Sequence, residues 1–206
     1  MKLTWLGHAC FLLETSGGSI VFDPYSPGSV PGVELPEDLT ADLVLCSHQH
    51  GDHCYPQGVK RSGREPALPI QRIPSFHDDA GGAQRGENTI TLVEAEGLRV
   101  VHLGDLGHML SEEQIASLGR VDLLMVPVGG FFTIDAATAW ALTEKLNPAI
   151  VVPMHYRAPG FGFDVIGTVD EFLALAKNVK ILDSNALEPD KLQTPVTAVL
   201  KCPVKE

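Results

Sequence analysis

The chain has 206 residues, of which 44% are hydrophobic and 20% are charged, a composition typical of a globular protein with a buried core. Its formal net charge of −11 disfavours DNA or RNA as a partner, because binding to a phosphate backbone requires a basic surface. The first residues lack the apolar stretch of a signal peptide, and no apolar run is long enough to span a membrane.

Cysteine usage agrees with a reducing compartment. The four cysteines show no paired spacing, and they are Cys10, Cys46, Cys54 and Cys202. Without an export signal, such cysteines are typical of reduced thiols. We therefore expect a cytoplasmic protein with no membrane partner and no nucleic-acid partner. The sequence leaves the oligomeric state open, with a homo-oligomer as one alternative.

The first half of the chain predicts β-strands and loops. A Ser-Gly-Gly-Ser turn at residues 16–19 separates two strands, and four prolines make residues 24–40 a long loop. Residues 61–69 also have loop composition. The strands that we expect are residues 2–6, 10–15, 20–22 and 42–46.

The second half alternates strands with helices. Residues 89–94 and 98–103 read as a hairpin, and the later strands are expected at residues 121–126, 149–152 and 196–200. Helices are expected to begin at Ser111, at Asp135, which caps a helix to about Leu146, and at Thr168, which caps one to about Lys177. This order predicts an α/β protein, a four-layer αβ/βα sandwich in a single domain spanning residues 1–206.

Metal-ligating side chains are concentrated just after the strand at residues 42–46. His48, His50, Asp52 and His53 lie within six residues. Side chains two apart in an extended segment point the same way, so His48 and His50 can bind one metal, while Asp52 and His53 can face a second. Nitrogen and carboxylate ligands at this density suit a divalent transition metal.

This run resembles the H-x-H-x-D-H signature of the metallo-β-lactamase fold superfamily. Further stretches, in the same order along the chain, resemble its family of L-ascorbate-6-phosphate lactonase-like metal-dependent hydrolases. The stretches are Gly7-His8-Ala9-Cys10-Phe11, Phe22-Asp23-Pro24, Phe76-His77, Leu103-Gly104-Asp105, residues 127–135 and Pro153-Met154-His155-Tyr156.

The resemblance implies a ligand set for two divalent metal ions, with Zn²⁺ as first choice and Mn²⁺ as second. It assigns His48, His50 and His77 to the first ion. It assigns Asp52, His53 and His155 to the second, with Asp105 bridging both. The family often has Gly-Asp-Thr where this chain has Leu106 after Asp105, which removes one hydroxyl beside the site.

Other polar residues are candidates for catalysis or support. Asp52, His8 and His108 are the expected catalytic residues; His8 is either a substrate contact and proton donor or a structural turn histidine. His102 is expected to be structural. Asp23 either orients a ligand histidine or ends its strand in a turn.

The motifs predict a hydrolase. The chain has no Gly-x-Ser-x-Gly, P-loop or dinucleotide motif, so metal ions are expected to carry the chemistry. Two divalent ions about 3.5–4 Å apart lower the pKa of a shared water toward about 7, and the hydroxide formed attacks carbon or phosphorus. The expected substrate is a small ester, lactone or phosphodiester, and the resemblance alone implies that it is anionic. The alternatives are a nuclease acting on nucleic acid, an iron-dependent redox protein, and a non-catalytic metal-binding ligand sensor.

Overall fold

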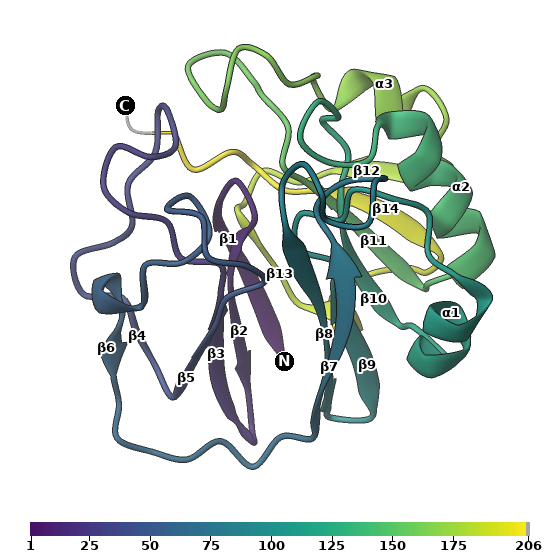
Figure 1. Cartoon of the computed structure of the whole chain (residues 1–206). Helices are drawn as coiled ribbons and strands as arrows, with labels where there is room; N and C mark the ends of the chain where they lie inside the picture. The colour runs from purple at the N-terminus through teal and green to yellow at the C-terminus, as the bar shows by residue number, and fades with distance from the viewer. Residues whose placement is uncertain (205–206) are drawn as a thin grey trace.

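Two β-sheets face each other in the structure, a computed structural model that describes residues 1–204 (Figure 1). The smaller sheet has five strands in the order β13 (Ala186–Leu187), β1 (Lys2–Gly7), β2 (Cys10–Thr15), β3 (Gly18–Phe22) and β5 (Leu43–Leu45). The larger sheet has seven, in the order β12 (Val179–Ile181), β14 (Val196–Val199), β11 (Ile150–Met154), β10 (Leu123–Pro127), β9 (Leu98–His102), β8 (Glu87–Ala95) and β7 (Ile70–Phe76). A two-stranded sheet pairs β4 (Thr40–Ala41) with β6 (Lys60–Arg61).

The helices lie on the outer face of the larger sheet (Figure 1). They are α1 (Glu112–Leu118), α2 (Ala136–Leu146) and α3 (Asp170–Leu173), and two 3₁₀ turns are η1 (Pro56–Gly58) and η2 (Pro189–Lys191). Within residues 1–204, the opposite side of the molecule carries loops, η1 and the β4–β6 pair instead of an α-helix. The described residues thus show the two sheets and one α-helical layer of the expected four-layer sandwich.

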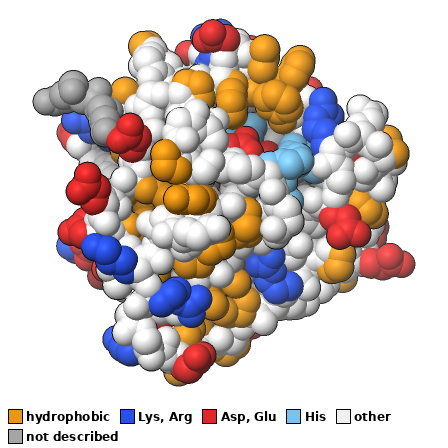
Figure 2. Space-filling view, turned by 60° about the vertical axis from the view of Figure 1, so that its left-hand side comes forward, with side chains coloured by type: hydrophobic (Ala, Val, Ile, Leu, Met, Phe, Trp, Pro, Cys, Tyr) orange, Lys and Arg blue, Asp and Glu red, His pale blue; other side chains and the backbone are white. Residues whose placement is uncertain are grey.

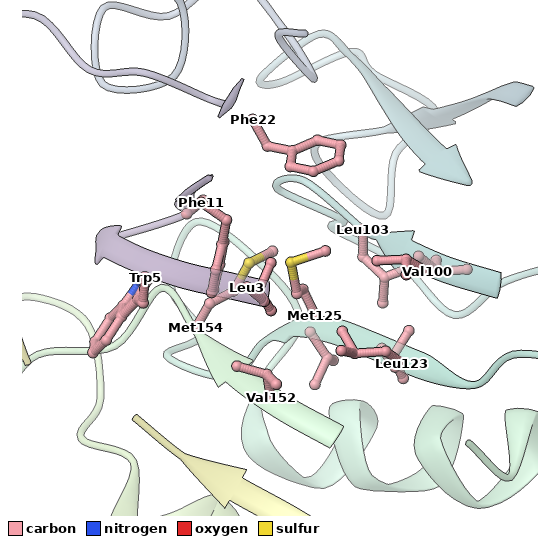
Figure 3. Packing of buried hydrophobic residues seen from close by; sticks show 14 of the residues in the cluster. Leu3, Trp5, Phe11, Phe22, Val100, Leu103, Leu123, Met125, Val152 and Met154 are labelled. Atoms are coloured by element: carbon pink, nitrogen blue, oxygen red, sulfur yellow. The ribbon is translucent and has the colours of Figure 1, made fainter. Parts of the chain in front are cut away.

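The core fills the space between the two sheets (Figure 3). Leu3 and Phe11 from the smaller sheet are fully buried, as are Leu123 and Met125 from the larger one. Every residue of β10 and β11 is buried, because these parallel strands are covered by helices on one face and by the smaller sheet on the other. Parallel pairing also places the carboxyl ends of β9, β10 and β11 at one edge.

Local sequence signals account for two helices. Ser111 and Gln114 form a capping box at the start of α1, as the expected N-cap requires. Asp135 accepts the backbone N–H of Thr138 at 2.8 Å, and Asn147 ends α2 in the left-handed conformation. The prediction of a helix from Asp135 to Leu146 is confirmed.

The predicted helix from Thr168 to Lys177 was wrong in extent. Only Asp170–Leu173 is helical, and the Thr168 hydroxyl contacts the Asp170 carboxylate instead of capping a backbone N–H. Phe172 is the one buried residue of this short helix.

Strand β7 was not predicted. Its sequence contains Pro74, which argues against a central strand, but β7 is the edge strand of its sheet and an edge tolerates proline. Within the described residues, no helix is long and apolar enough to cross a membrane.

Candidate metal centre

Five loops at the strand ends bring the histidines together. His8 lies in the turn between β1 and β2, the run from His48 to His53 follows β5, and His77 follows β7. Asp105 follows β9 and His155 follows β11. Residues far apart in the sequence thus meet where strand ends of the smaller sheet, β1 and β5, come together with strand ends of the larger sheet, β7, β9 and β11.

The side chains form three overlapping groups whose ligand atoms lie within 4.8 Å of one another. The first group is His48, His50 and His77, the set expected for the first metal. The second is His8, His53 and His155, and the third is His48, His53 and Asp105. Two centres that share neighbouring ligands are therefore geometrically available.

Asp52 differs from its expected place. Among the described residues it belongs to none of the three groups, and His8 occupies the corresponding position beside His53 and His155. The Asp52 carboxylate lies 3.5 Å from Nε2 of His8 and 3.9 Å from Nε2 of His53. Asp52 is thus adjacent to the second group.

Asp105 lies between the groups. Its Oδ2 is 3.1 Å from Nε2 of His53 and 3.2 Å from Nε2 of both His77 and His155. The carboxylate is 2% exposed, and its Oδ1 has no hydrogen-bond partner within residues 1–204. A single carboxylate that contacts histidines of both groups has the position of a bridging ligand.

The backbone before Asp105 requires a glycine. Gly104 has φ +59°, and a Cβ there would collide with the Asn88 amide and the Ser47 side chain. Asn88 accepts the Asp105 backbone N–H at 3.0 Å and donates to the carbonyl of Leu103 at 2.9 Å. Sequence reasoning did not identify Asn88 as the residue that fixes this turn, since an isolated Asn in a strand carries no signal.

Contacts made by the Nδ1 atoms of His53 and His77 orient these two rings. Asp23 accepts the backbone N–H and the hydroxyl of Ser47, both at 2.6 Å, and its Oδ2 lies 2.8 Å from Nδ1 of His53. His77 directs Nδ1 to the carbonyl of Phe132 at 3.1 Å. In both histidines these contacts leave Nε2 facing the cluster, the arrangement that metal sites commonly use. Of the two roles left open for Asp23, the geometry shows the orienting one.

Left-handed backbone conformations concentrate at this centre. Asp23, His8 and His155 have φ of 44°, 54° and 55° although none is glycine. The His155 N–H donates to the His8 carbonyl at 3.3 Å, and the two imidazole rings are 4.0 Å apart. Such conformations are costly and persist where the surrounding structure enforces them, which is common at functional sites.

The residues present fit divalent cations. Several buried ligand atoms have no hydrogen-bond partner within residues 1–204, and they are Nε2 of His48, His53 and His155, both ring nitrogens of His8, and Oδ1 of Asp105. Burial lowers the pKa of His8 to about 3 and that of His48 to about 4. These imidazoles are therefore neutral and keep a lone pair, and an unpartnered buried polar atom is costly unless a ligand satisfies it.

Two histidines lie outside the cluster. His108, expected as a catalytic residue, accepts the backbone N–H of Phe76 at 3.2 Å and places Nδ1 2.9 Å from the carbonyl of Met109. Both ring nitrogens of His108 are thus engaged with backbone atoms, and among the described residues His108 belongs to none of the three groups. His102 binds the carbonyl of Ala9 at 2.8 Å and stacks on Phe22, so its expected structural role is confirmed.

A cavity of about 180 Å³ opens onto the cluster, lined by His50, Asp52, His77, Arg85, Asp105, Phe132 and Phe163. Figure 2 shows histidine and acidic side chains at the surface, bordered by hydrophobic side chains and a basic one. Phe132 lies in residues 127–135, one of the stretches that resemble the family, whereas Arg85 and Phe163 belong to no motif in the sequence. The cavity gives a small molecule access to the metal-ligating side chains.

Facing sheets with helices outside the larger one, and an aspartate shared by two histidine groups at the strand ends, define a protein of the metallo-β-lactamase fold class. The chain belongs to the beta-lactamase superfamily domain family, whose sequence profile matches residues 2–155, and to the UPF0173 metal-dependent hydrolases within it. The expected superfamily is thereby confirmed, and the L-ascorbate-6-phosphate lactonase-like branch stays a prediction.

Individual relatives match three quarters of the chain or more. A UPF0173 metal-dependent hydrolase of Carboxydothermus hydrogenoformans is 29% identical over 89% of this chain and 97% of its own length. One of Archaeoglobus fulgidus is 30% identical over 76% of this chain and 84% of its own. A solved structure from Thermotoga maritima, described as a Zn-dependent hydrolase of the metallo-beta-lactamase superfamily, has a TM-score of 0.76 at 35% identity and covers 97% of this chain and 99% of its own.

Removal of a single histidine, from either the first or the second group, is expected to cost the protein one metal ion. His48→Ala and His155→Ala should each lower the metal content from about two to about one per chain, because each deletes a donor of a different centre. Elemental analysis of the purified variants measures this. His108→Ala is the matched control and should keep the wild-type content, since His108 lies outside the groups. A count of two in either ligand variant would contradict the assignment.

Proposed function

We propose that the protein is a dinuclear metal-dependent hydrolase that cleaves an ester, lactone or phosphodiester bond in a small anionic molecule. The observation that carries this proposal is Asp105, whose Oδ2 lies within 3.2 Å of histidines from both groups. His48, His50 and His77 would hold one divalent ion, and Asp52, His53 and His155 the other, with Zn²⁺ as first choice and Mn²⁺ as second. Bound divalent ions would supply an activated water and polarise the oxygen of the bond under attack.

The protein's own residues prepare the reaction. Asp52 lines the cavity and is the candidate proton acceptor for the attacking water. Nε2 of His8 lies 3.5 Å from the Asp52 carboxylate, so His8 is placed to orient that carboxylate. Asp105 and Asp23 add negative charge beside His53, which stabilises a cationic centre.

Two aromatic side chains of the cavity also favour metal-dependent hydrolysis. Phe132 and Phe163 line the cavity with ring centroids 5.9 Å apart, and Phe163 also lies 5.5 Å from His8. Apolar side chains exclude water and strengthen electrostatic interactions with the substrate. Leu106, where the lactonase-like family often has threonine, is fully buried in the core.

The relatives support hydrolysis, and the motifs resemble the L-ascorbate-6-phosphate lactonase-like branch. A nuclease is the second candidate within the same fold. The net charge of −11 argues against it, because a nucleic-acid substrate requires a basic surface.

A substrate panel on metal-reconstituted protein tests the proposal. The panel contains lactones, carboxylic esters, thioesters and phosphodiesters, each assayed with Zn²⁺ and with Mn²⁺. We expect metal-dependent turnover of at least one class. Tight ligand binding with no turnover of any class would instead favour a ligand sensor, and a coloured, iron-loaded protein that consumes oxygen would favour redox chemistry.

A further inference from the structure

Arg85 is the arginine that lines the cavity beside the histidine cluster. It lines this cavity together with Asp105 and His77, and its guanidinium lies 5.8 Å from the ring centre of Phe132. Stacking of this kind holds the guanidinium plane while leaving its N–H groups available.

Arg85 also borders a second cavity. This one has a volume of about 410 Å³ and shares His50 and Arg85 with the first. Its lining includes Arg72 and one carboxylate, Glu87, so the charged side chains there are two cations and one anion. Arg72 is engaged with the carbonyl of Cys46, whereas Arg85 stands where the two cavities meet.

The guanidinium of Arg85 has no carboxylate partner within residues 1–204, where every ion pair joins other residues. The chain has 26 acidic and 15 basic side chains, so partners for an arginine are plentiful. A half-buried cation left unpaired beside a reactive centre is suited to a ligand that brings its own negative charge.

The loop that carries Arg85 is held in a fixed shape. Asp78, the residue after His77, is 2% exposed, and its two carboxylate oxygens accept four backbone N–H groups at 2.7–2.9 Å. The donors are Ala80, Gly82, Gln84 and Arg85 itself. One buried carboxylate therefore ties the Arg85 backbone to the segment that presents a metal-site histidine. The backbone of Arg85 is held in place before a ligand binds, and such preorganisation lowers the cost of binding.

We propose that Arg85 binds an oxyanion of the substrate and so selects molecules that carry a carboxylate or phosphate close to the bond that is cleaved, with the remainder extending into the second cavity. A guanidinium pairs with such groups through two parallel hydrogen bonds. The inference rests on the proposed function, since it takes the histidine centre as the place of cleavage. It adds the residue that recognises the charge and the direction in which the substrate lies.

Equilibrium binding of phenylphosphonate to the metal-loaded protein tests the inference, because this anion is not hydrolysed. Calorimetric titrations compare the wild type with Arg85→Gln, Arg85→Lys and Arg64→Gln, and Arg64 is an exposed arginine outside both cavities. We expect Arg85→Gln to weaken binding about 10- to 100-fold, the range for a lost charge-assisted hydrogen bond, and Arg85→Lys to weaken it less. Benzoate replaces phenylphosphonate in a second series, to separate carboxylate from phosphate preference.

The controls separate recognition from folding. Dimethyl phenylphosphonate has the same ring without the charge, and its binding should be equal in the wild type and Arg85→Gln. Arg64→Gln should leave all affinities unchanged, and every variant should keep two metals per chain. The inference is overturned if Arg85→Gln binds phenylphosphonate as the wild type does, if the neutral diester loses affinity equally, or if the wild type binds neither anion.

These binding results stand apart from the substrate panel. Selective loss of anion binding in Arg85→Gln, with no turnover of any panel member, would support anion recognition by Arg85 and contradict the proposed hydrolase activity. Turnover of a panel member, with unchanged anion binding in Arg85→Gln, would support the hydrolase activity and contradict anion recognition by Arg85.

Discussion

Asp105→Ala is expected to lower turnover by several orders of magnitude and to disturb both metals at once. Asp105 is buried, and its Oδ2 contacts His53, His77 and His155 at 3.1–3.2 Å, so its removal takes away the carboxylate that contacts histidines of both proposed ligand sets. Mutual repulsion between two divalent ions is then no longer offset by a shared negative charge. Asp105→Asn keeps the shape but loses the charge, and it should be nearly as harmful to turnover.

Activity and metal content are measured together on both variants. Asp38→Ala serves as the control, because Asp38 is exposed and, among the described residues, belongs to none of the three groups. Near-normal turnover of Asp105→Ala with two metals bound would show that the site is built from other residues. A loss of one metal only would assign Asp105 to a single centre.

Exhaustive chelation is expected to abolish activity and to lower the melting temperature, and both should recover when metal returns. Removing the ions leaves buried ligand atoms of His8, His48, His53 and His155 without partners. Metal at about 1,000 times its dissociation constant stabilises the fold by about 4 kcal/mol. For a chain of this size that corresponds to a difference of about 8–16 °C in melting temperature.

Calorimetry of the apo and reconstituted forms measures this difference, with elemental analysis on the same samples. Coincident melting curves would mean that the cluster holds no metal in the folded state. Activity that persists in a sample free of metal would refute the hydrolase proposed above.

The sequence alone determined the features whose signals lie close together along the chain. The run from His48 to His53 supplies four ligand-type side chains by its own spacing, and the strand at residues 10–15 and the helix capped by Asp135 match the structure. These predictions succeeded because propensity, capping and short spacings act between chain neighbours.

Tertiary structure alone decided which distant residues meet. It placed His8 beside His53 and His155, with the Asp52 carboxylate next to His8, and it turned His108 toward the backbone of Phe76 and Met109. It also brought Arg85 to the cavity through a loop organised by Asp78. The meeting of His8 with His53 and His155 has no local signal, because it depends on how strands far apart in the chain pair and pack, and sheet pairing is set by contacts between residues far apart in sequence.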